Sequence, residues 1–265
     1  MEREAAKNHG GSCELIVLGS GTCVPTGSRG PASYVFRKGS EALLIDMGAG
    51  CLEKLAKCGI SYRDIGGVIL SHFHVDHTSE LPLLLFANNY TPGHARTAPL
   101  KILGPEGLEA FLKNLERLYP WVKPLHYEIT TLSGTSPSAT FPGSVAVTSC
   151  PAAHGDGRAL SVRLDTGSVS ITYSGDTGYN RDLVALAAKT DLLIVECSFP
   201  AGSESEVEGH LTPHLAAKIA SRCGAGKVIL SHLYPEAFNP DPVASFLEIS
   251  SAEVIVAHDL LRLTL

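Results

Sequence analysis

The sequence predicts an α/β fold, and three observations support this class. Short apolar runs rich in β-branched residues recur along the chain, and segments with the helical period lie between some of them. The 265 residues are enough to bury a substantial core in one large domain or two packed halves. The words GVILSHF, from Gly67, and KVILSHL, from Lys227, nearly repeat each other. Two similar halves fit a sandwich with the active site along the shared edge, although chance similarity explains the repeat equally well.

The elements follow in chain order from their periodicity. Strands are predicted by the runs ELIVLGSG, EALLIDMG, GVILSH, LKILGP, SVAVTSC, SVSITYSG, DLLIVEC, KVILSH and EVIVAHD. GLEAFLKNLERLY predicts an amphipathic helix, because its leucines recur at the helical spacing. LTPHLAAKIASRC predicts another, with Thr212 as N-cap and Pro213 at its first position. The stretch 132–144 predicts a loop, and the polar residues 1–12 a flexible extension, which leaves 13–265 as a single domain.

The composition excludes several classes of protein. With 44% hydrophobic and 18% charged residues the chain is typical of globular proteins, and no apolar run approaches the roughly 18–20 residues of a membrane span. The polar start lacks the apolar core of a secretory signal, so we expect a cytoplasmic protein without membrane contact. Seven scattered cysteines without a C-x-x-C pair indicate reduced thiols. A net charge of -6 argues against extensive nucleic-acid binding, which calls for a basic surface.

The stretch VILSHFHVDHTSELPLLLF crowds titratable groups behind a buried strand. His72 and His74 point the same way in an extended segment, so they can converge on one point. Asp76 and His77 follow where the chain turns toward helix and can reach a second point nearby. Imidazole and carboxylate are the ligands that zinc and similar ions prefer, and burying them without a partner is costly. A metal site is therefore favoured over a solvated, histidine-rich loop.

Three further residues, His154, Asp176 and His232, each follow an apolar strand. Each alone is more often a satisfied loop residue than a ligand. With the first cluster they make up the ligand set of two metal ions that share one carboxylate. Zn²⁺ is the favoured ion, with Mn²⁺ or Fe²⁺ as alternatives.

The pattern H-x-H-x-D-H, followed in order by His, Asp and His, resembles the metallo-β-lactamase fold superfamily over nearly the whole chain. This resemblance implies an αββα sandwich. It implies one metal on His72, His74 and His154, another on Asp76, His77 and His232, and Asp176 as the bridge. It also implies that Asp46, in LLIDMGAG, orients the ligands without binding metal.

VEGHLTPHLAAKIA and LLIVECSF resemble the His-Ser/Met-Thr-Ala and His-Glu-Ala-Thr motifs of the ribonuclease Z group, with Cys197 and Ser198 departing from the small residues there. The comparison implies that His210 is the general acid for the leaving oxygen and that Glu196 orients it. For His210, a surface histidine before an N-cap is the alternative. VPTGSRGPAS resembles the loop that clamps the RNA end and leaves Arg29 as a substrate-binding residue.

The chain departs from a full transfer-RNA processing enzyme, because only 22 positions separate His154 from Asp176. That interval is too short for the long RNA-binding arm of the group, although an arm elsewhere, in 83–101, stays open. We therefore expect a phosphodiesterase for small diesters, in which a hydroxide between two metals attacks phosphorus, Asp76 accepts its proton and His210 protonates the leaving group.

Alternatives remain within the same metal chemistry and outside it. A sulfuric-ester, lactone or thioester hydrolase and an RNA 3′-processing endoribonuclease use the same site, and a metal-binding sensor without turnover is a further class. A homodimer is compatible with the sequence. The apolar stretch 79–93 could line a pocket or a dimer face, but core packing is the favoured interpretation for most of it.

Overall fold

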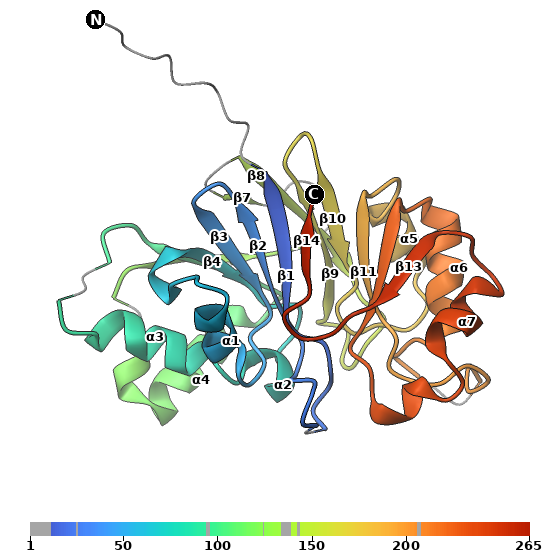
Figure 1. Ribbon diagram of the computed structural model, residues 1–265. Helices are drawn as coiled ribbons and strands as arrows, with labels where there is room; N and C mark the ends of the chain where they lie inside the picture. Colours follow the sequence, from blue (N-terminus) through green and yellow to red (C-terminus); the bar gives the residue numbers. More distant parts are fainter. Residues whose placement is uncertain are drawn as a thin grey trace, which may run out of the picture.

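A computed structural model describes residues 12–24, 26–93, 96–123, 125–133, 139–141, 144–205 and 208–265. The expected N-terminal extension, 1–12, lies outside these residues except for Ser12. Most of the expected loop 132–144 also lies outside them. Two β-sheets, drawn side by side in Figure 1, form the centre of the molecule.

The first sheet has seven strands in the order β14-β1-β2-β3-β4-β5-β6. The strands from β14 to β3 pair antiparallel, and those from β3 to β6 pair parallel. Their bounds are Cys13–Gly19 (β1), Ser33–Lys38 (β2), Glu41–Ile45 (β3), Ile65–Ile69 (β4), Leu100–Gly104 (β5), Tyr127–Thr131 (β6) and Arg262–Thr264 (β14). The last strand of the chain thus closes the edge of the first sheet.

The second sheet has seven strands in the order β13-β12-β11-β10-β9-β8-β7. The strands from β7 to β10 pair antiparallel, and those from β10 to β13 pair parallel. Their bounds are Ala139–Phe141 (β7), Val145–Pro151 (β8), Leu160–Asp165 (β9), Ser170–Tyr173 (β10), Leu192–Glu196 (β11), Lys227–Ser231 (β12) and Glu253–Val256 (β13). The two sheets therefore repeat one pattern of strand directions.

This repetition confirms two similar halves, but the repeated sequence words are not their equivalents. The word at Gly67 lies in β4, which pairs with the first parallel strand of its sheet, β3. The word at Lys227 lies in β12, one place further from the corresponding strand, β10. The repeated words thus reflect two buried Val/Ile strands and do not mark corresponding positions.

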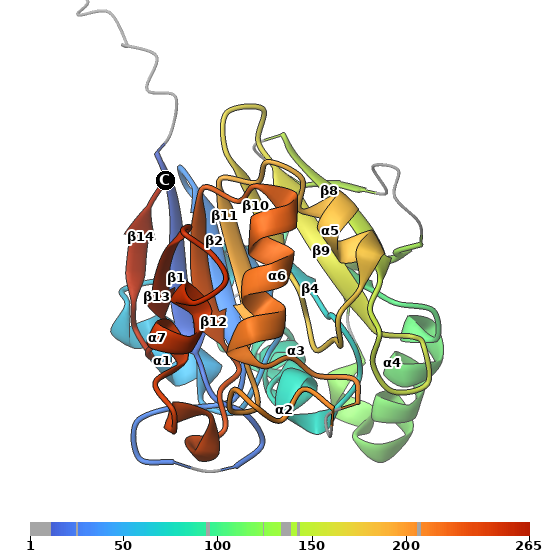
Figure 2. The ribbon, with the colours of Figure 1, turned by 90° about the vertical axis from the view of Figure 1, so that its right-hand side faces the viewer.

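Helices cover the outer face of each sheet. On the first sheet lie α1 (Cys51–Lys57), α3 (Leu81–Tyr90) and α4 (Leu108–Leu118), whose leucines join an apolar cluster with β4 and β5. On the second lie α5 (Arg181–Leu186), α6 (Pro213–Cys223) and α7 (Pro242–Leu247), as Figure 2 shows. A third cluster, which includes Leu15, Tyr34, Ile171 and Ile194, fills the space between the sheets. The αββα sandwich is therefore confirmed.

Short elements complete the chain and position its loops. They are α2 (Val75–Thr78) and the 3₁₀ turns η1 (Tyr62–Asp64), η2 (Pro120–Val122) and η3 (Pro235–Phe238). The stretch 79–93 forms α3 and the turn after it. Leu81, Leu84 and Leu85 are core residues, whereas Leu83 and Phe86 are exposed, so core packing describes only one face of this helix. Within the described ranges, no helix is both long and apolar enough to cross a membrane.

Two tyrosines join the sheets beneath the edge where the parallel strands end. Tyr34 of β2 donates a hydrogen bond to Ser231 Oγ at 2.7 Å, and Tyr173 of β10 donates to Asp46 Oδ2 at 2.8 Å. Their ring centroids lie 5.1 Å apart. Because both hydroxyls are bonded across the interface, burial of these large side chains fixes the two sheets in register under the site.

Candidate metal centre

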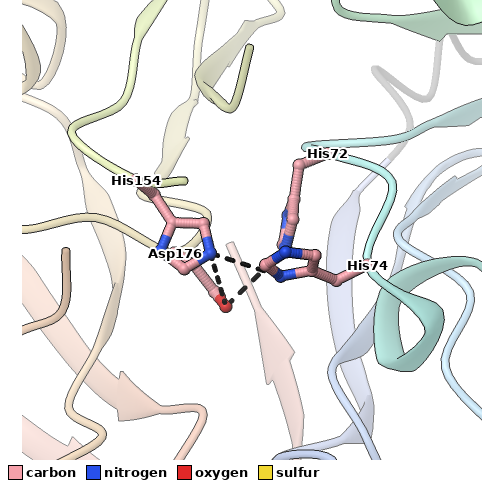
Figure 3. A group of neighbouring side chains, drawn as sticks. All are labelled: His72, His74, His154 and Asp176. Carbon is pink, nitrogen blue, oxygen red and sulfur yellow. Dashed lines mark hydrogen bonds and ion pairs between the residues drawn. The ribbon is translucent and has the colours of Figure 1, made fainter. Parts of the chain in front are cut away.

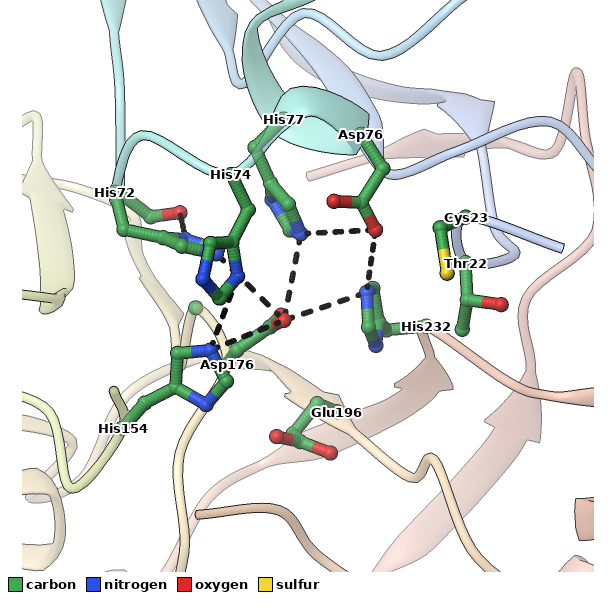
Figure 4. A network of polar contacts seen from close by, with 12 residues as sticks. Thr22, Cys23, His72, His74, Asp76, His77, His154, Asp176, Glu196 and His232 are labelled. Atoms are coloured by element: carbon green, nitrogen blue, oxygen red, sulfur yellow. Dashed lines mark hydrogen bonds and ion pairs between the residues drawn. The ribbon is translucent and has the colours of Figure 1, made fainter.

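The seven expected ligands come from four loops at one edge of the sandwich. His72 and His74 follow β4, and α2 carries Asp76 and His77. The other three follow strands of the second sheet: His154 after β8, Asp176 after β10 and His232 after β12. Figures 3 and 4 show these side chains pointing toward one another across the junction of the halves.

The side chains form two groups that meet at one carboxylate. His72, His74, His154 and Asp176 offer ligand atoms within 4.8 Å of one another, and so do Asp76, His77 and His232. Asp176 Oδ2 lies 3.4 Å from Nε2 of His77 and 3.5 Å from that of His232, atoms of the second group. The same oxygen lies 3.8 Å from His72 Nε2 in the first group. Asp176 thus lies between the two groups, and its bridging part stays a prediction.

The residues fit divalent cations, because the centre contains buried polar atoms without partners. Nε2 of His72, His77 and His232 and Oδ1 of Asp176 have no hydrogen-bond partner among the described residues. Leaving such atoms unpaired in a buried place costs free energy, and bound cations would satisfy them. The donor set of imidazole nitrogens and carboxylate oxygens is the one that zinc and similar ions take.

Asp46 orients two histidines that follow the first sheet, His77 directly and His72 through Ser71. It is fully buried at the end of β3, with φ of 55°. Its Oδ2 accepts from His77 Nδ1 at 2.8 Å, from Tyr173 Oη at 2.8 Å and from Ser71 Oγ at 2.7 Å. Because the Ser71 hydroxyl is used in this way, its oxygen accepts from His72 Nδ1 at 3.0 Å. Both imidazoles are thereby oriented through Nδ1, which directs Nε2 toward the centre, as a metal ligand requires.

The second sheet uses a similar arrangement. Ser198 Oγ donates to Glu196 Oε2 at 2.6 Å and therefore accepts from His232 Nδ1 at 3.0 Å. His154 Nδ1 donates to the carbonyl oxygen of Gly209 at 2.9 Å. In both histidines Nε2 is turned toward Asp176. Four of the five histidines are thus oriented through Nδ1 by a neighbouring oxygen.

The electrostatics of the centre shift the pKa values of its residues in different directions. Burial, assisted by the neighbouring His77, lowers the pKa of His72 to about 2, so its ring is neutral. Burial opposes the charge of Asp176, but His232 and His77 outweigh it and hold the pKa of that carboxyl well below its usual value. Burial likewise opposes the charge of Asp76, whose pKa is nevertheless lowered to about 2 by His232 and His77. Burial lowers the pKa of His77, but the charges of Asp176 and Asp46 outweigh it and raise that pKa well above the ordinary value, so a cation bound there would replace the proton on its ring.

Beside the centre, His210 and Glu196 form a separate pair. His210 Nδ1 donates to Glu196 Oε1 at 2.9 Å. Glu196 is buried and also accepts from the backbone N–H groups of Thr177 at 2.7 Å and Leu211 at 3.1 Å, so its charge is well compensated. Burial lowers the pKa of His210, but the hydrogen bond and charge of Glu196 outweigh it, so the pKa is raised above the ordinary value.

His210 faces the centre from the second sheet. One of its ring nitrogens lies within 4.8 Å of ligand atoms of Asp176 and His232. Its ring centroid is 4.7 Å from that of His154 and 6.1 Å from that of His232. Because Nδ1 is engaged by the glutamate, Nε2 is the atom available for proton transfer at the centre.

Comparison with known proteins agrees with this geometry. Residues 42–233 match the family described as a beta-lactamase superfamily domain, and this span is more than half of the chain. The chain belongs to the beta-lactamase superfamily. The family resemblance carried by the H-x-H-x-D-H pattern is therefore confirmed.

Individual members of the superfamily match almost the whole chain. Ribonuclease Z of Mycobacterium bovis (strain BCG / Pasteur 1173P2) is 28% identical over 272 residues, which cover 94% of this chain and 97% of that protein. The crystal structure of the metallo-beta-lactamase fold protein YhfI from Bacillus subtilis matches with a TM-score of 0.82 at 25% identity, covering 96% of this chain and 99% of that one. The crystal structure of human tRNase Z, short form, matches with a TM-score of 0.77 at 24% identity, covering 94% and 98%, and shows the fold alone.

Arg29, the expected substrate-binding residue, contacts other parts of the protein in the structure. Its Nη1 donates to Ser20 Oγ at 2.9 Å and to the carbonyl oxygen of Ala257, and the guanidinium lies 4.8 Å from the ring centroid of Phe238. Burial lowers its pKa, while Asp259 opposes that effect. These contacts hold Arg29 against the loop after β1, and its part in substrate binding stays a prediction.

Three orienting residues were not predicted from the sequence. Ser71 directly precedes His72, and the Ser-His step was visible as part of a strand end, but its hydrogen bond to Asp46 was not. Ser198 was noted only as a departure from the ribonuclease Z motif, although it joins Glu196 to His232. Tyr173 carries no local signal at all, because its partner Asp46 is 127 positions away.

Proposed function

We propose that the protein is a dinuclear-metal-dependent hydrolase whose favoured substrates are phosphodiesters. The observation that carries the proposal is a seven-ligand centre with a separate proton donor, His210, beside it. A good leaving group departs without a proton, whereas an alkoxide needs one. A half-buried acid next to the centre therefore supports hydrolysis of esters with poor leaving groups, which phosphodiesters have.

Each residue has a part that follows from its position. Divalent ions held by the seven ligands would supply Lewis acidity and lower the pKa of attacking water toward neutrality. Asp76, the partly exposed carboxylate of the set, accepts the proton of the attacking water. His210 gives the proton on Nε2 to the leaving oxygen, and Glu196 stabilises the charged imidazole through Nδ1.

A second candidate is cleavage at the 3′ end of RNA, which the similarity to Ribonuclease Z of Mycobacterium bovis favours. The acidic net charge of -6 and the short interval of 22 positions between His154 and Asp176 favour small diesters over folded RNA. Residues 83–101, the alternative place for an RNA-binding arm, include the end of α3 and the start of β5. Sulfuric esters, lactones and thioesters remain substrates that the same ligands could serve.

The test is hydrolysis of bis(p-nitrophenyl) phosphate by zinc- and manganese-loaded protein. p-Nitrophenyl sulfate, a lactone, a thioester and a precursor RNA with a 3′ extension are assayed in parallel. We expect turnover of the diester, its loss in His74→Ala, and retention in His126→Ala, which removes an exposed histidine outside the centre. Cleavage of the sulfate, lactone or thioester with an untouched diester would replace the phosphodiesterase assignment, and silence on every substrate would favour a metal-binding protein without turnover.

A further inference from the structure

We propose that a pocket beside the first ligand group binds the ester group that stays on phosphorus, and that it accepts a flat ring group of nucleoside size. The pocket has a volume of about 300 Å³. His72, His74 and His154 line it together with Phe73, and the exposed residues Asp156 and Arg158 lie at its rim. The inference rests on the phosphodiesterase proposed above and assigns one side of its substrate.

The position of the pocket separates the two ester groups of a diester. Its lining includes the three histidines of the first ligand group, so a phosphoryl group at the centre would lie next to the pocket. The leaving group has to reach His210, which does not line this pocket and lies between His154 and His232. The pocket is therefore left for the retained ester group. Its volume is at the lower end of the roughly 300–1,000 Å³ of small-molecule sites, which suits one ring-bearing group.

The wall of the pocket is flat and held in place. The ring of Phe73 stacks on that of Phe111 in α4, with centroids 4.7 Å apart and an interplanar angle of 12°. Phe111 thus covers one face of Phe73 and fixes its orientation, while Phe73 remains half-buried and lines the pocket. A preoriented aromatic face costs little entropy to use, and stacking on it accepts nucleobases and other planar rings.

The rim supplies polar groups next to this ring. Arg158 donates to Asp156 Oδ2 from Nε at 2.8 Å and also from Nη2. Its Nη1 has no acceptor among the residues that the structure describes. At Gly107 an added Cβ would lie 3.3 Å from Arg158 Nη1 and 3.7 Å from the Phe73 ring, so guanidinium and ring converge at that glycine. A ring stacked on Phe73 would present its polar edge to free donors of Arg158 and to the Asp156 carboxylate.

The experiment uses diesters that share p-nitrophenolate as leaving group and differ only in the retained group. Thymidine 5′-(p-nitrophenyl phosphate) carries a nucleoside there, and methyl p-nitrophenyl phosphate carries one carbon. Because this leaving group needs no proton, the ratio of their kcat/KM values reports on the retained group alone. We expect the wild-type protein to favour the nucleoside ester. Phe73→Leu should lower the ratio about 10-fold, and Arg158→Ala should lower it roughly 5-fold.

Matched controls and a binding measurement complete the design. Phe86→Leu and Arg181→Ala remove an exposed phenylalanine and an exposed arginine away from this pocket, and both should keep the wild-type ratio. The zinc content of each variant is measured, because Phe73 lies between two ligands; should Phe73→Leu lose zinc, Arg158→Ala alone decides. Titration calorimetry gives the affinity for thymidine 5′-monophosphate, the product that keeps the retained group, relative to methyl phosphate.

The outcomes separate this inference from the proposed function. Cleavage of both diesters with one unchanged ratio in all variants would overturn the pocket assignment and leave the phosphodiesterase standing. Cleavage of neither diester would overturn the proposed function. Calorimetry then decides the pocket by itself: weaker thymidine 5′-monophosphate binding in Phe73→Leu and Arg158→Ala supports it, and equal binding in all variants overturns it.

Discussion

At the scale of single residues, the orientation of four histidines of the centre depends on a neighbouring oxygen outside the ligand set. Asp46 accepts hydrogen bonds from His77, Ser71 and Tyr173, and Ser198 transmits the charge of Glu196 to His232. Such neighbours lock the tautomer and the ring plane, so that forming the centre costs little further ordering. Loss of one neighbour should therefore weaken metal binding without removing a ligand.

Asp46→Asn is the change that tests this dependence. An amide in place of the carboxylate removes a negative charge and points N–H donors at groups that are donors themselves. We expect zinc affinity to fall about 10–100-fold, measured by competition with a chromogenic chelator. Asp182→Asn, at the exposed start of α5, is the matched control and should bind zinc like the wild type. Equal affinities of the two variants would mean that Asp46 has no orienting part.

His210 gives a second prediction at this scale, in the pH dependence of activity. An acid works only while protonated, and Glu196 raises the pKa of His210 above the ordinary value of about 6.5. With a poor leaving group, such as an alkyl diester, kcat/KM should therefore persist above that pH and fall as pH rises through the raised pKa. His210→Ala should lose about 10²–10⁴-fold with that substrate and show no such basic limb.

The choice of leaving group supplies the control for His210. With p-nitrophenolate as leaving group the wild type should show a weaker basic limb, and His210→Ala should lose much less activity, because no proton is needed. If His210→Ala were equally impaired with both leaving groups, the imidazole would serve binding or folding and would not be the general acid.

At the scale of elements, the loops at strand ends and before helices place the site residues at one edge of the sandwich. The segment before α6 carries His210, and Thr212 begins that helix as its N-cap. The Thr212 hydroxyl accepts from the Leu215 N–H at 3.4 Å and donates to Glu204 Oε1 at 2.8 Å. The cap therefore joins the loop before the helix to its first turn.

Replacing the cap tests how much this junction contributes to stability. Thr212→Ala should lower the free energy of unfolding by about 1 kcal/mol, because an N–H at the helix start loses its acceptor. Thr212→Ser keeps the hydroxyl and should stay close to the wild type. Urea unfolding at fixed pH measures both. A serine variant as unstable as the alanine variant would show that the buried methyl group, and not the cap, matters at this position.

At the scale of the whole molecule, the site exists only where the two sheets meet, so the packing between them determines the distances in the centre. One close contact lies at Gly67 of β4, where an added Cβ would come within 1.9 Å of the Phe141 ring in β7. The neighbouring Gly66 has only Glu41 Oε2 at 3.4 Å and Ala42 O at 3.8 Å near its Cβ position. Two adjacent glycines of one strand thus face very different surroundings.

Alanine substitutions at these two glycines test how tightly the two sheets pack. Gly67→Ala should destabilise the protein by about 1–3 kcal/mol, because the Phe141 ring has to move out of a filled core. Gly66→Ala, which meets a flexible side chain, should change stability by less than about 0.5 kcal/mol. Thermal and urea unfolding compare the two variants. Equal stabilities would mean that the interior between the sheets adapts freely at this place.

The oligomeric state also belongs to this scale. The homodimer with which the sequence is compatible stays a prediction, to be measured by analytical ultracentrifugation. Leu83 and Phe86 of α3 line a shallow apolar pocket with Trp121 of η2. All three side chains are exposed, so the outer face of α3 is apolar, which the core-packing interpretation of 79–93 did not predict.

Much of the fold could be predicted from local periodicity, and what could not has a physical reason. The helices at GLEAFLKNLERLY and LTPHLAAKIASRC and the buried strands were visible, because a buried face imposes its period on the residues that form it. Strands β2 and β9 were not predicted, although both pair with predicted neighbours. Their polar residues, such as Arg37 and Arg163, interrupt the apolar run that marks a strand. Helices α1, α5 and α7 are too short to show a helical period clearly.

The sequence by itself determined the chemical identity of the centre. Local spacing was enough to place His72 and His74 together and to mark Asp76 and His77 beside them. The order of the later ligands along the chain completed the pattern of the superfamily. Residue types and short spacings can be read directly from the sequence, so the class of reaction could be inferred before the fold was known.

Only the tertiary structure decided how those residues are held and what lies next to them. The hydrogen bond from Tyr173 to Asp46, the parallel stack of Phe73 on Phe111 and the hydrogen bond from Arg29 to Ser20 all depend on which strands and loops become neighbours. Contacts between distant residues follow from sheet order and from the packing of two halves, and no local period encodes them. For that reason the residues that gather at the centre, and Asp46 and Glu196 beside them, could be predicted from the sequence, whereas Ser71, Ser198, Tyr173 and the pocket could not.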